Sequence, residues 1–117
     1  MKSENVVQTK SYDFALKIIK VYKYLSQEKK EFVLSKQLLR SGTSIGANIE
    51  ESIGGQSRAD FFAKLTIAYK ETRESKYWIR LLRDSDYLTI QQSEDLLNDI
   101  EELLKIIGSI QKSVRNS

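Results

Sequence analysis

The segment RSGTSIGANIEES, residues 40–52, combines apolar residues at helical spacing with several residues that weaken a helix. On a helix its isoleucines belong to a longer stripe, Leu34, Leu38, Ile45, Ile49 and Ile53. Beside the stripe runs a row of polar residues: Gln37, Arg40, Ser44, Asn48 and Glu51. The glycines, serines, threonine and asparagine together disfavour an isolated helix by about 4 kcal/mol. Packing against other helices must therefore hold this segment.

The composition of the chain excludes whole classes of chemistry. Its 117 residues include no Cys, no His and no Pro. Without Cys and His there are no thiolate or imidazole nucleophiles and none of the usual zinc, haem or histidine-containing di-iron sites, so we expect no metal and no cofactor. The length suits one domain, residues 1–117. A polar start and the lack of a long apolar run predict a cytoplasmic protein with no membrane partner.

The apolar periodicity predicts four helices, at residues 11–26, 33–53, 58–84 and 89–114, with flexible ends. We expect Gly54 and Gly55 to end the second helix in the left-handed conformation. Ser57 and Thr89 are predicted to cap the third and fourth helices. Helices of similar length joined by short connections favour antiparallel neighbours. The predicted fold is an all-α, antiparallel, up-down-up-down four-helix bundle.

An antiparallel turn between the second and third helices would bring the polar row close to the third helix. Gly42 and Gly46 are then predicted to be close-packing sites against the third helix. Arg40 would lie within one turn of Glu71 and Glu74, where a guanidinium can bind carboxylates. The five polar residues and Glu74 are together called the polar seam below. The seam is either a half-buried structural network or a contact with another subunit or partner.

Basic residues gather on the third helix, and five are candidates for binding nucleic acid: Lys70, Arg73, Lys76, Arg80 and Arg83. Phe62 and Tyr69 flank this stripe in projection. A basic stripe with aromatic residues can follow a phosphate backbone, and the sequence pI of about 9.1 agrees. A solvated helical face would have the same pattern.

Residues 84–104 carry seven acids and no base. A basic flank and an acidic flank would let copies of the chain attach head to tail, and such contacts can close into a ring. A ring would also collect several basic chains around one axis. Weak phosphate binding by one chain could then become strong through multivalency.

An enzymatic role finds little support in the sequence. Glu71 and Glu74 supply one half of the paired motif with which helical nucleotide pyrophosphohydrolases hold magnesium. The other half is missing, because Glu50 and Glu51 diverge by about 100° on a helix. Ser44 has no base to activate it. We therefore predict no catalytic residues and no enzyme activity.

The run from Ser35 to Ser52, followed by Asp60-Phe61, Leu65 to Ala68 and Glu74, resembles a bacterial family of four-helix bundles. Its members are encoded in intervening sequences of large-subunit ribosomal RNA genes, and the accessory variability protein of diversity-generating retroelements is similar to them. The most specific part is the pattern Arg-Ser-x-x-Ser-Ile-x-x-Asn-Ile-x-Glu, which begins at Arg40.

The resemblance implies a homopentameric ring with no known catalysis. For the retroelement relatives it also implies binding of nucleic acid and of a reverse transcriptase. We therefore predict a non-enzymatic homo-oligomeric bundle that acts as an adaptor on RNA or DNA backbones. The alternative is a protein-binding scaffold or assembly module with no nucleic-acid role.

Overall fold

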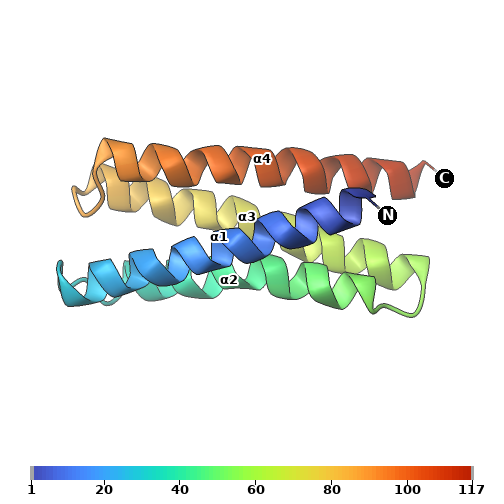
Figure 1. Cartoon of the computed structure of the whole chain (residues 1–117), viewed down its shortest axis with the longest axis horizontal. Helices are drawn as coiled ribbons and strands as arrows, with labels where there is room; N and C mark the ends of the chain where they lie inside the picture. Colours follow the sequence, from blue (N-terminus) through green and yellow to red (C-terminus); the bar gives the residue numbers. More distant parts are fainter. Residues whose placement is uncertain (1, 117) are drawn as a thin grey trace.

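A computed structural model describes the backbone of residues 2–116 and the side chains of residues 6–116. Within that part of the chain there are four helices: α1 (Lys2–Gln27), α2 (Leu34–Ile53), α3 (Arg58–Asp84) and α4 (Ile90–Arg115). They run alternately up and down and form an elongated bundle of 46 × 21 × 19 Å (Figure 1). The predicted all-α, up-down-up-down bundle is confirmed.

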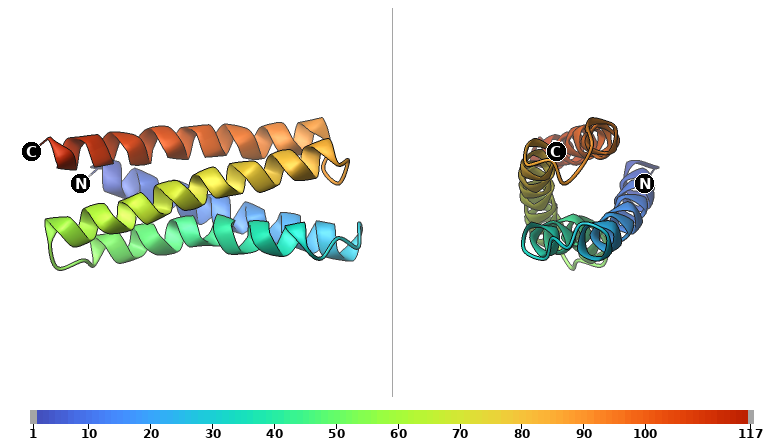
Figure 2. Two further views of the ribbon diagram at one scale, coloured as in Figure 1. Left: turned by 180° about the vertical axis from the view of Figure 1, so that it is seen from behind. Right: turned by 90° about the vertical axis from the view of Figure 1, so that its left-hand side faces the viewer.

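The bundle is open along one edge. Seen from its end, the four helices follow one another around a curve that does not close between α1 and α4 (Figure 2). Each helix packs along its sequence neighbour, whereas α1 and α4 make far fewer contacts with each other. α1 also crosses the bundle obliquely (Figure 1). The edge between α1 and α4 is therefore the most loosely packed part of the bundle.

The core consists of the apolar stripes that the spacing predicted. On α2, Leu38, Ile45 and Ile49 are buried, while Leu34 and Ile53 at the two ends of the helix are less so. Fully buried side chains from the other three helices complete this core: Phe14, Ile18, Leu25, Leu65, Ile79, Leu82, Ile100, Leu103 and Ile107. Within residues 2–116, no helix is both long enough and apolar enough to span a bilayer.

The expected start of the first helix at Ser11 is wrong, because α1 begins at Lys2. Val7 and Ser11 are each 1% exposed and lie on the same side of α1 as Phe14. They extend the buried stripe to Val7, about one turn before the expected start. The polar residues around Val7 conceal this signal in the sequence. Of the ends expected to be flexible, residues 1 and 117 lie outside the described part of the chain.

The connection between α1 and α2 contains a cap that the sequence analysis did not identify. Glu31 is 8% exposed, and its carboxylate accepts hydrogen bonds from the backbone N–H groups of Val33, Leu34 and Ser35, at 3.1, 2.9 and 2.7 Å. Burial raises the pKa of Glu31, but these backbone bonds outweigh it and hold the pKa below its ordinary value. The first orphan donors of α2 are thus satisfied by one ionised side chain.

The other helix ends follow the sequence signals in part. Ser57 caps α3 by accepting a bond from the backbone N–H three residues later, at 3.1 Å, and Thr89 begins α4 in a reciprocal capping box. The predicted left-handed conformation at Gly54 and Gly55 is wrong. Gly54 has a φ of −83°, and none of the described glycines has a positive φ. The backbone N–H groups of Gly54 and Gly55 donate to the carbonyls of Glu50 and Ser52, so α2 ends without a left-handed residue.

Gly42 and Gly46 lie against α1, so their expected contact with the third helix is wrong. A Cβ atom added at Gly42 would lie 2.8 Å from Cγ1 of Ile18, and one at Gly46 would lie 3.4 Å from the backbone oxygen of Ser11. α2 is flanked by α1 on one side and α3 on the other. Ser41, one residue before Gly42 and therefore about 100° around the helix, contacts α3 through Ser75.

Candidate nucleic-acid interface

Arg40 joins α2 to α3 through two carboxylates. Its Nη1 lies 3.2 Å from Oε1 of Glu71, and its Nη2 contacts Oε2 of Glu74. The Glu74 carboxylate also accepts a hydrogen bond from Nε1 of Trp78, at 2.9 Å. The pKa of Glu74 lies below its ordinary value, mainly because its carboxylate accepts the hydrogen bond from Trp78. Burial opposes this shift, and the Arg40 guanidinium adds to it. The two acids of the half magnesium motif are therefore directed at a guanidinium.

The remaining members of the polar seam do not form one connected network. The Ser44 hydroxyl and the Asn48 amide each donate to the backbone carbonyl four residues earlier, at 2.6 and 2.8 Å. Glu51 reaches across to Lys64 on α3, at 2.7 Å, and Gln37 is exposed. The seam thus attaches α2 to α3 at Arg40 and at Glu51, near its two ends. Ser44 and Asn48, between these two links, bond only to backbone carbonyls of α2 in the hydrogen bonds given above.

A buried polar link joins α2 to α3 one step around the helix from the seam. Ser75 and Ser41 are both 0% exposed, and their hydroxyl oxygens lie 2.8 Å apart. The pairing of Ser75 with Ser41 was not predicted from the sequence. The spacing of Ser41 from the buried Leu38 and Ile45 was the signal that could have placed it on the buried side.

The five candidate basic residues divide into two sets. Lys76 is paired with Glu101 of α4, and Arg83 is paired with Asp84, each at 2.7 Å. The other three are exposed and have no acidic group within 4.0 Å among the described residues: Lys70, Arg73 and Arg80. Lys76 is rotated from Arg73 toward α4, where it meets Glu101, whereas Arg83 pairs with the next residue of its own helix. The predicted stripe is therefore narrower than the sequence suggested.

An exposed aromatic side chain lies within the set of unpaired cations. Tyr77 is 52% exposed and follows Arg73 by four positions and precedes Arg80 by three, so all three share one side of α3. We call Lys70, Arg73, Tyr77 and Arg80 the α3 basic face. The helix that carries this face, α3, lies in front in the left view of Figure 2.

The aromatic residues that the sequence placed beside the basic stripe lie elsewhere. Phe62 and Tyr69 are half-buried, and Tyr69 lies close to Gly108 of α4. Tyr77 was missed, although its spacing from Arg73 and Arg80 was the available signal.

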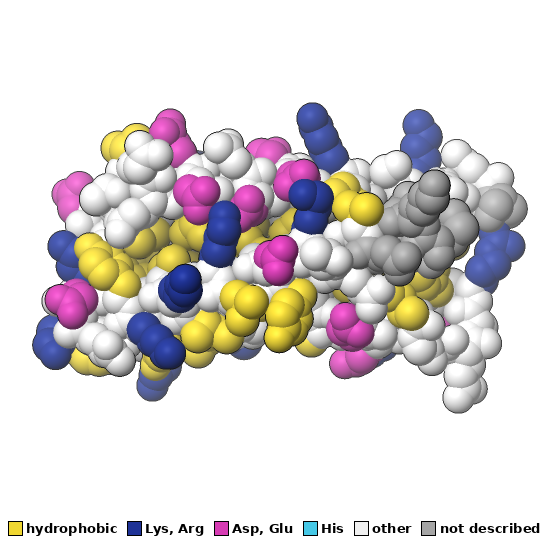
Figure 3. Space-filling model, in the orientation of Figure 1, with side chains coloured by type: hydrophobic (Ala, Val, Ile, Leu, Met, Phe, Trp, Pro, Cys, Tyr) yellow, Lys and Arg dark blue, Asp and Glu magenta, His cyan; other side chains and the backbone are white. Residues whose placement is uncertain are grey.

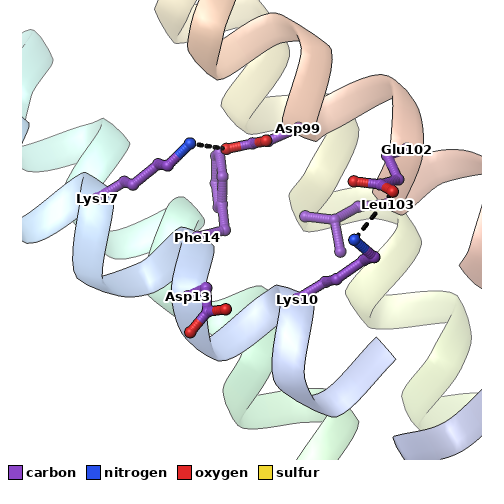
Figure 4. Close-up of a pocket in the computed structure, with 7 residues that line it drawn as sticks. All are labelled: Lys10, Asp13, Phe14, Lys17, Asp99, Glu102 and Leu103. Atoms are coloured by element: carbon purple, nitrogen blue, oxygen red, sulfur yellow. Dashed lines mark hydrogen bonds and ion pairs between the residues drawn. The ribbon is translucent and has the colours of Figure 1, made fainter. Parts of the chain in front are cut away.

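The acids of α4 do not form a free acidic flank, contrary to expectation. Nζ of Lys17 lies 3.1 Å from Asp95 and 2.8 Å from Asp99, and Nζ of Lys10 lies 3.0 Å from Glu102. These pairs bridge the open edge between α1 and α4, and Figure 4 shows those that involve Asp99 and Glu102. The hydrogen bond to Asp99 is the main reason that the pKa of Lys17 is raised. With the Lys76–Glu101 pair from α3, bases on both neighbouring helices pair with four of the five acids of α4.

These features define an open antiparallel four-helix bundle with a basic face that contains an aromatic residue. The chain belongs to the family described as 23S rRNA-intervening sequence protein, whose family model matches residues 3–109. That description names no reaction.

A solved structure shows the same fold. The crystal structure of a protein of unknown function from the S23 ribosomal protein family of Bacteroides thetaiotaomicron is similar, with 54% sequence identity and a TM-score of 0.93. The similarity covers 94% of this chain and 98% of that one. None of the curated proteins matches the chain.

Proposed function

We propose that this chain is a cytoplasmic, non-enzymatic, self-assembling adaptor that binds the backbone of RNA or DNA through the α3 basic face. The observation that carries the proposal is the set of three exposed cations, Lys70, Arg73 and Arg80, none of which has a carboxylate within 4.0 Å among the described residues. The acid that Arg80 senses, Asp84, is already in contact with Arg83. The other two basic residues of the predicted stripe, Lys76 and Arg83, are already in ion pairs. An unpaired cation gains more from a phosphate than a paired one, because no existing contact is lost.

The geometry limits the strength of binding by one protomer. Lys70 and Arg80 are ten positions apart, which is about 15 Å along the helix at 1.5 Å per residue. Three cations release counterions from about three phosphates, so a fourfold rise in salt should weaken binding by about 20-fold to 40-fold. Affinity in a working range therefore requires several copies of the face acting together, which self-assembly would supply.

The test compares two variants by fluorescence anisotropy with labelled RNA and DNA at several salt concentrations. The first variant replaces the three cations of the α3 basic face with Glu. The control carries the same change in net charge at exposed lysines of the other three helices: Lys23, Lys36 and Lys105. We expect only the first variant to lose affinity and salt dependence. Equal losses in both variants, or no loss in either, would refute the proposed face.

A second candidate function is a protein assembly module, and a different surface favours it. Tyr12, Leu16 and Ile19 are 63%, 47% and 38% exposed and lie at spacings of four and three on α1. They face away from Phe14 and Ile18, so α1 carries a second apolar stripe on its outer side. Hydrophobic side chains are visible along α1 on the surface shown in Figure 3. We call these three residues the α1 apolar stripe.

We propose that a second copy of this chain covers the α1 apolar stripe. The resemblance seen in the sequence, with its implied homopentameric ring, supports this occupant over a different protein such as a reverse transcriptase. Light scattering is expected to find an oligomer for the natural chain and a smaller species for Leu16→Glu with Ile19→Glu. Ile90→Glu, at a residue 63% exposed on α4, is the control and should leave the mass unchanged. A natural chain that is monomeric would refute this proposal.

A further inference from the structure

The position of Tyr77 suggests more than a phosphate contact. Its ring is the exposed aromatic group of the α3 basic face, and the guanidinium-bearing positions 73 and 80 lie about 6 Å and 4.5 Å from it along the helix axis. A base stacked on this ring would therefore have a cation on either side for its neighbouring phosphates. Aromatic rings combined with a positively charged track are the usual means of holding single-stranded nucleic acid.

The Tyr77 ring rests on a side chain that is itself fixed. The ring centroids of Tyr77 and Trp78 lie 5.2 Å apart, with an angle of 69° between the planes. Nε1 of Trp78 donates to the Glu74 carboxylate at 2.9 Å, and Glu74 is in turn held by Arg40 of α2. A side chain ordered before binding loses less conformational freedom when a ligand arrives. Part of the polar seam thus acts as a brace behind the exposed ring.

We infer that Tyr77 is a stacking site for an unpaired base, so that the α3 basic face prefers single-stranded over double-stranded nucleic acid. This inference rests on the proposed function of the same face. In a duplex the bases are stacked on one another and are not available to a surface ring, so the cations alone contribute to binding. In a single strand the ring adds a contact that does not depend on sequence, since every base has a π face. Glu74 and Arg40 are positioning residues for that contact.

The experiment measures the affinity of the full chain for a labelled single-stranded oligonucleotide and for a duplex of the same length, at one salt concentration. Tyr77→Ala should weaken single-strand binding by about tenfold, the effect of one stacked base, and leave duplex binding unchanged. Tyr77→Phe keeps the ring and should retain the preference. Glu74→Gln loosens the brace, so it should lower the ratio of single-strand to duplex affinity while the helical circular dichroism signal stays the same.

Trp78 supplies an independent readout, because it is the one tryptophan of the chain and contacts Tyr77. Its emission should change when a single strand binds and should not change with duplex. If Tyr77→Ala weakens both ligands equally or neither of them, the stacking inference is wrong, and loss of both ligands in the triple Glu variant would still support the proposed function. If neither ligand binds the natural chain, the proposed function itself is refuted.

Discussion

Replacing each interior glycine of α2 with alanine should change stability in opposite directions. A Cβ at position 42 would lie 2.8 Å from Cγ1 and 3.0 Å from Cγ2 of Ile18, which is 0% exposed. These atoms are bonded directly to the Cβ of Ile18, so they cannot move without a shift of the side chain or of α1. At position 46 the nearest atoms, Ser11 O and Oγ, are both at 3.4 Å, which is an ordinary contact.

Two opposing effects set the magnitudes. Alanine in place of glycine stabilises a helix interior by about 1 kcal/mol. Overpacking of a filled core costs about 1–3 kcal/mol. For Gly42→Ala the packing cost exceeds the gain, and we expect a net loss of about 1 kcal/mol. For Gly46→Ala the gain remains, and we expect the protein to be more stable by up to about 1 kcal/mol.

Thermal unfolding followed by circular dichroism would measure both effects. A change of 1 kcal/mol corresponds to a shift in Tm of about 4 °C for a chain of this size. All variants must be compared at one protomer concentration, since assembly makes Tm depend on concentration. If Gly42→Ala is as stable as Gly46→Ala, or more stable, the argument from the Ile18 contact is refuted.

A double-mutant cycle would identify Ile18 as the cause. Ile18→Ala alone removes a buried side chain and should cost about 2–5 kcal/mol. In its presence the alanine at position 42 no longer meets Cγ1 and Cγ2, so its penalty should disappear. We expect a coupling energy of about 1–2 kcal/mol between the two positions. Additive effects would mean that the penalty of Gly42→Ala arises elsewhere.

Three further predictions concern the polar contacts. The pKa of Glu31 is lowered in the folded chain, so its contribution to stability is present above about pH 4.5 and is lost as the pH falls through its folded value. Glu31→Gln should therefore cost about 1 kcal/mol at neutral pH. Urea titrations should show that this difference in unfolding free energy shrinks in acid. Ser75→Ala removes the hydrogen bond that the buried Ser41 hydroxyl accepts, leaves that hydroxyl only its long bond to the Leu38 carbonyl, and should cost about 0.5–1 kcal/mol. Replacing both serines with alanine should be no worse than replacing one, as chemical denaturation would show. Lys17→Met should cost less than about 1 kcal/mol, because the ion pairs with Asp95 and Asp99 are partly exposed; a difference in unfolding free energy that did not shrink in high salt would contradict an electrostatic origin.

Local patterns along the chain predicted much of the fold. The spacing of apolar residues located all four helices, although it missed the first turns of α1, because burial repeats with the helical period. Ser57 and Thr89 were recognised as caps, since capping depends on residues within one turn. The meeting of Arg40 with Glu71 and Glu74 followed from the short turn between α2 and α3, which sets their register.

The candidate site was only partly predictable. The sequence identified the basic residues of α3 but not which of them remain unpaired, because the partner of Lys76 belongs to α4. Tyr77 was overlooked for a related reason. Whether an aromatic residue is half-buried like Tyr69 or exposed like Tyr77 depends on where the neighbouring helices lie.

The sequence by itself determined that this chain is a four-helix bundle, that residues 40–52 must be held by packing, and that positive charge gathers on α3. Only the tertiary structure decided that Gly42 and Gly46 pack against α1, that most acids of α4 pair with bases from two helices, and that Tyr77 is exposed between cations with no carboxylate within 4.0 Å. The physical reason is that periodicity places a residue at an angle around its own helix. The handedness of the helix arrangement decides which neighbouring helix lies at that angle. This handedness is a property of the whole packed core.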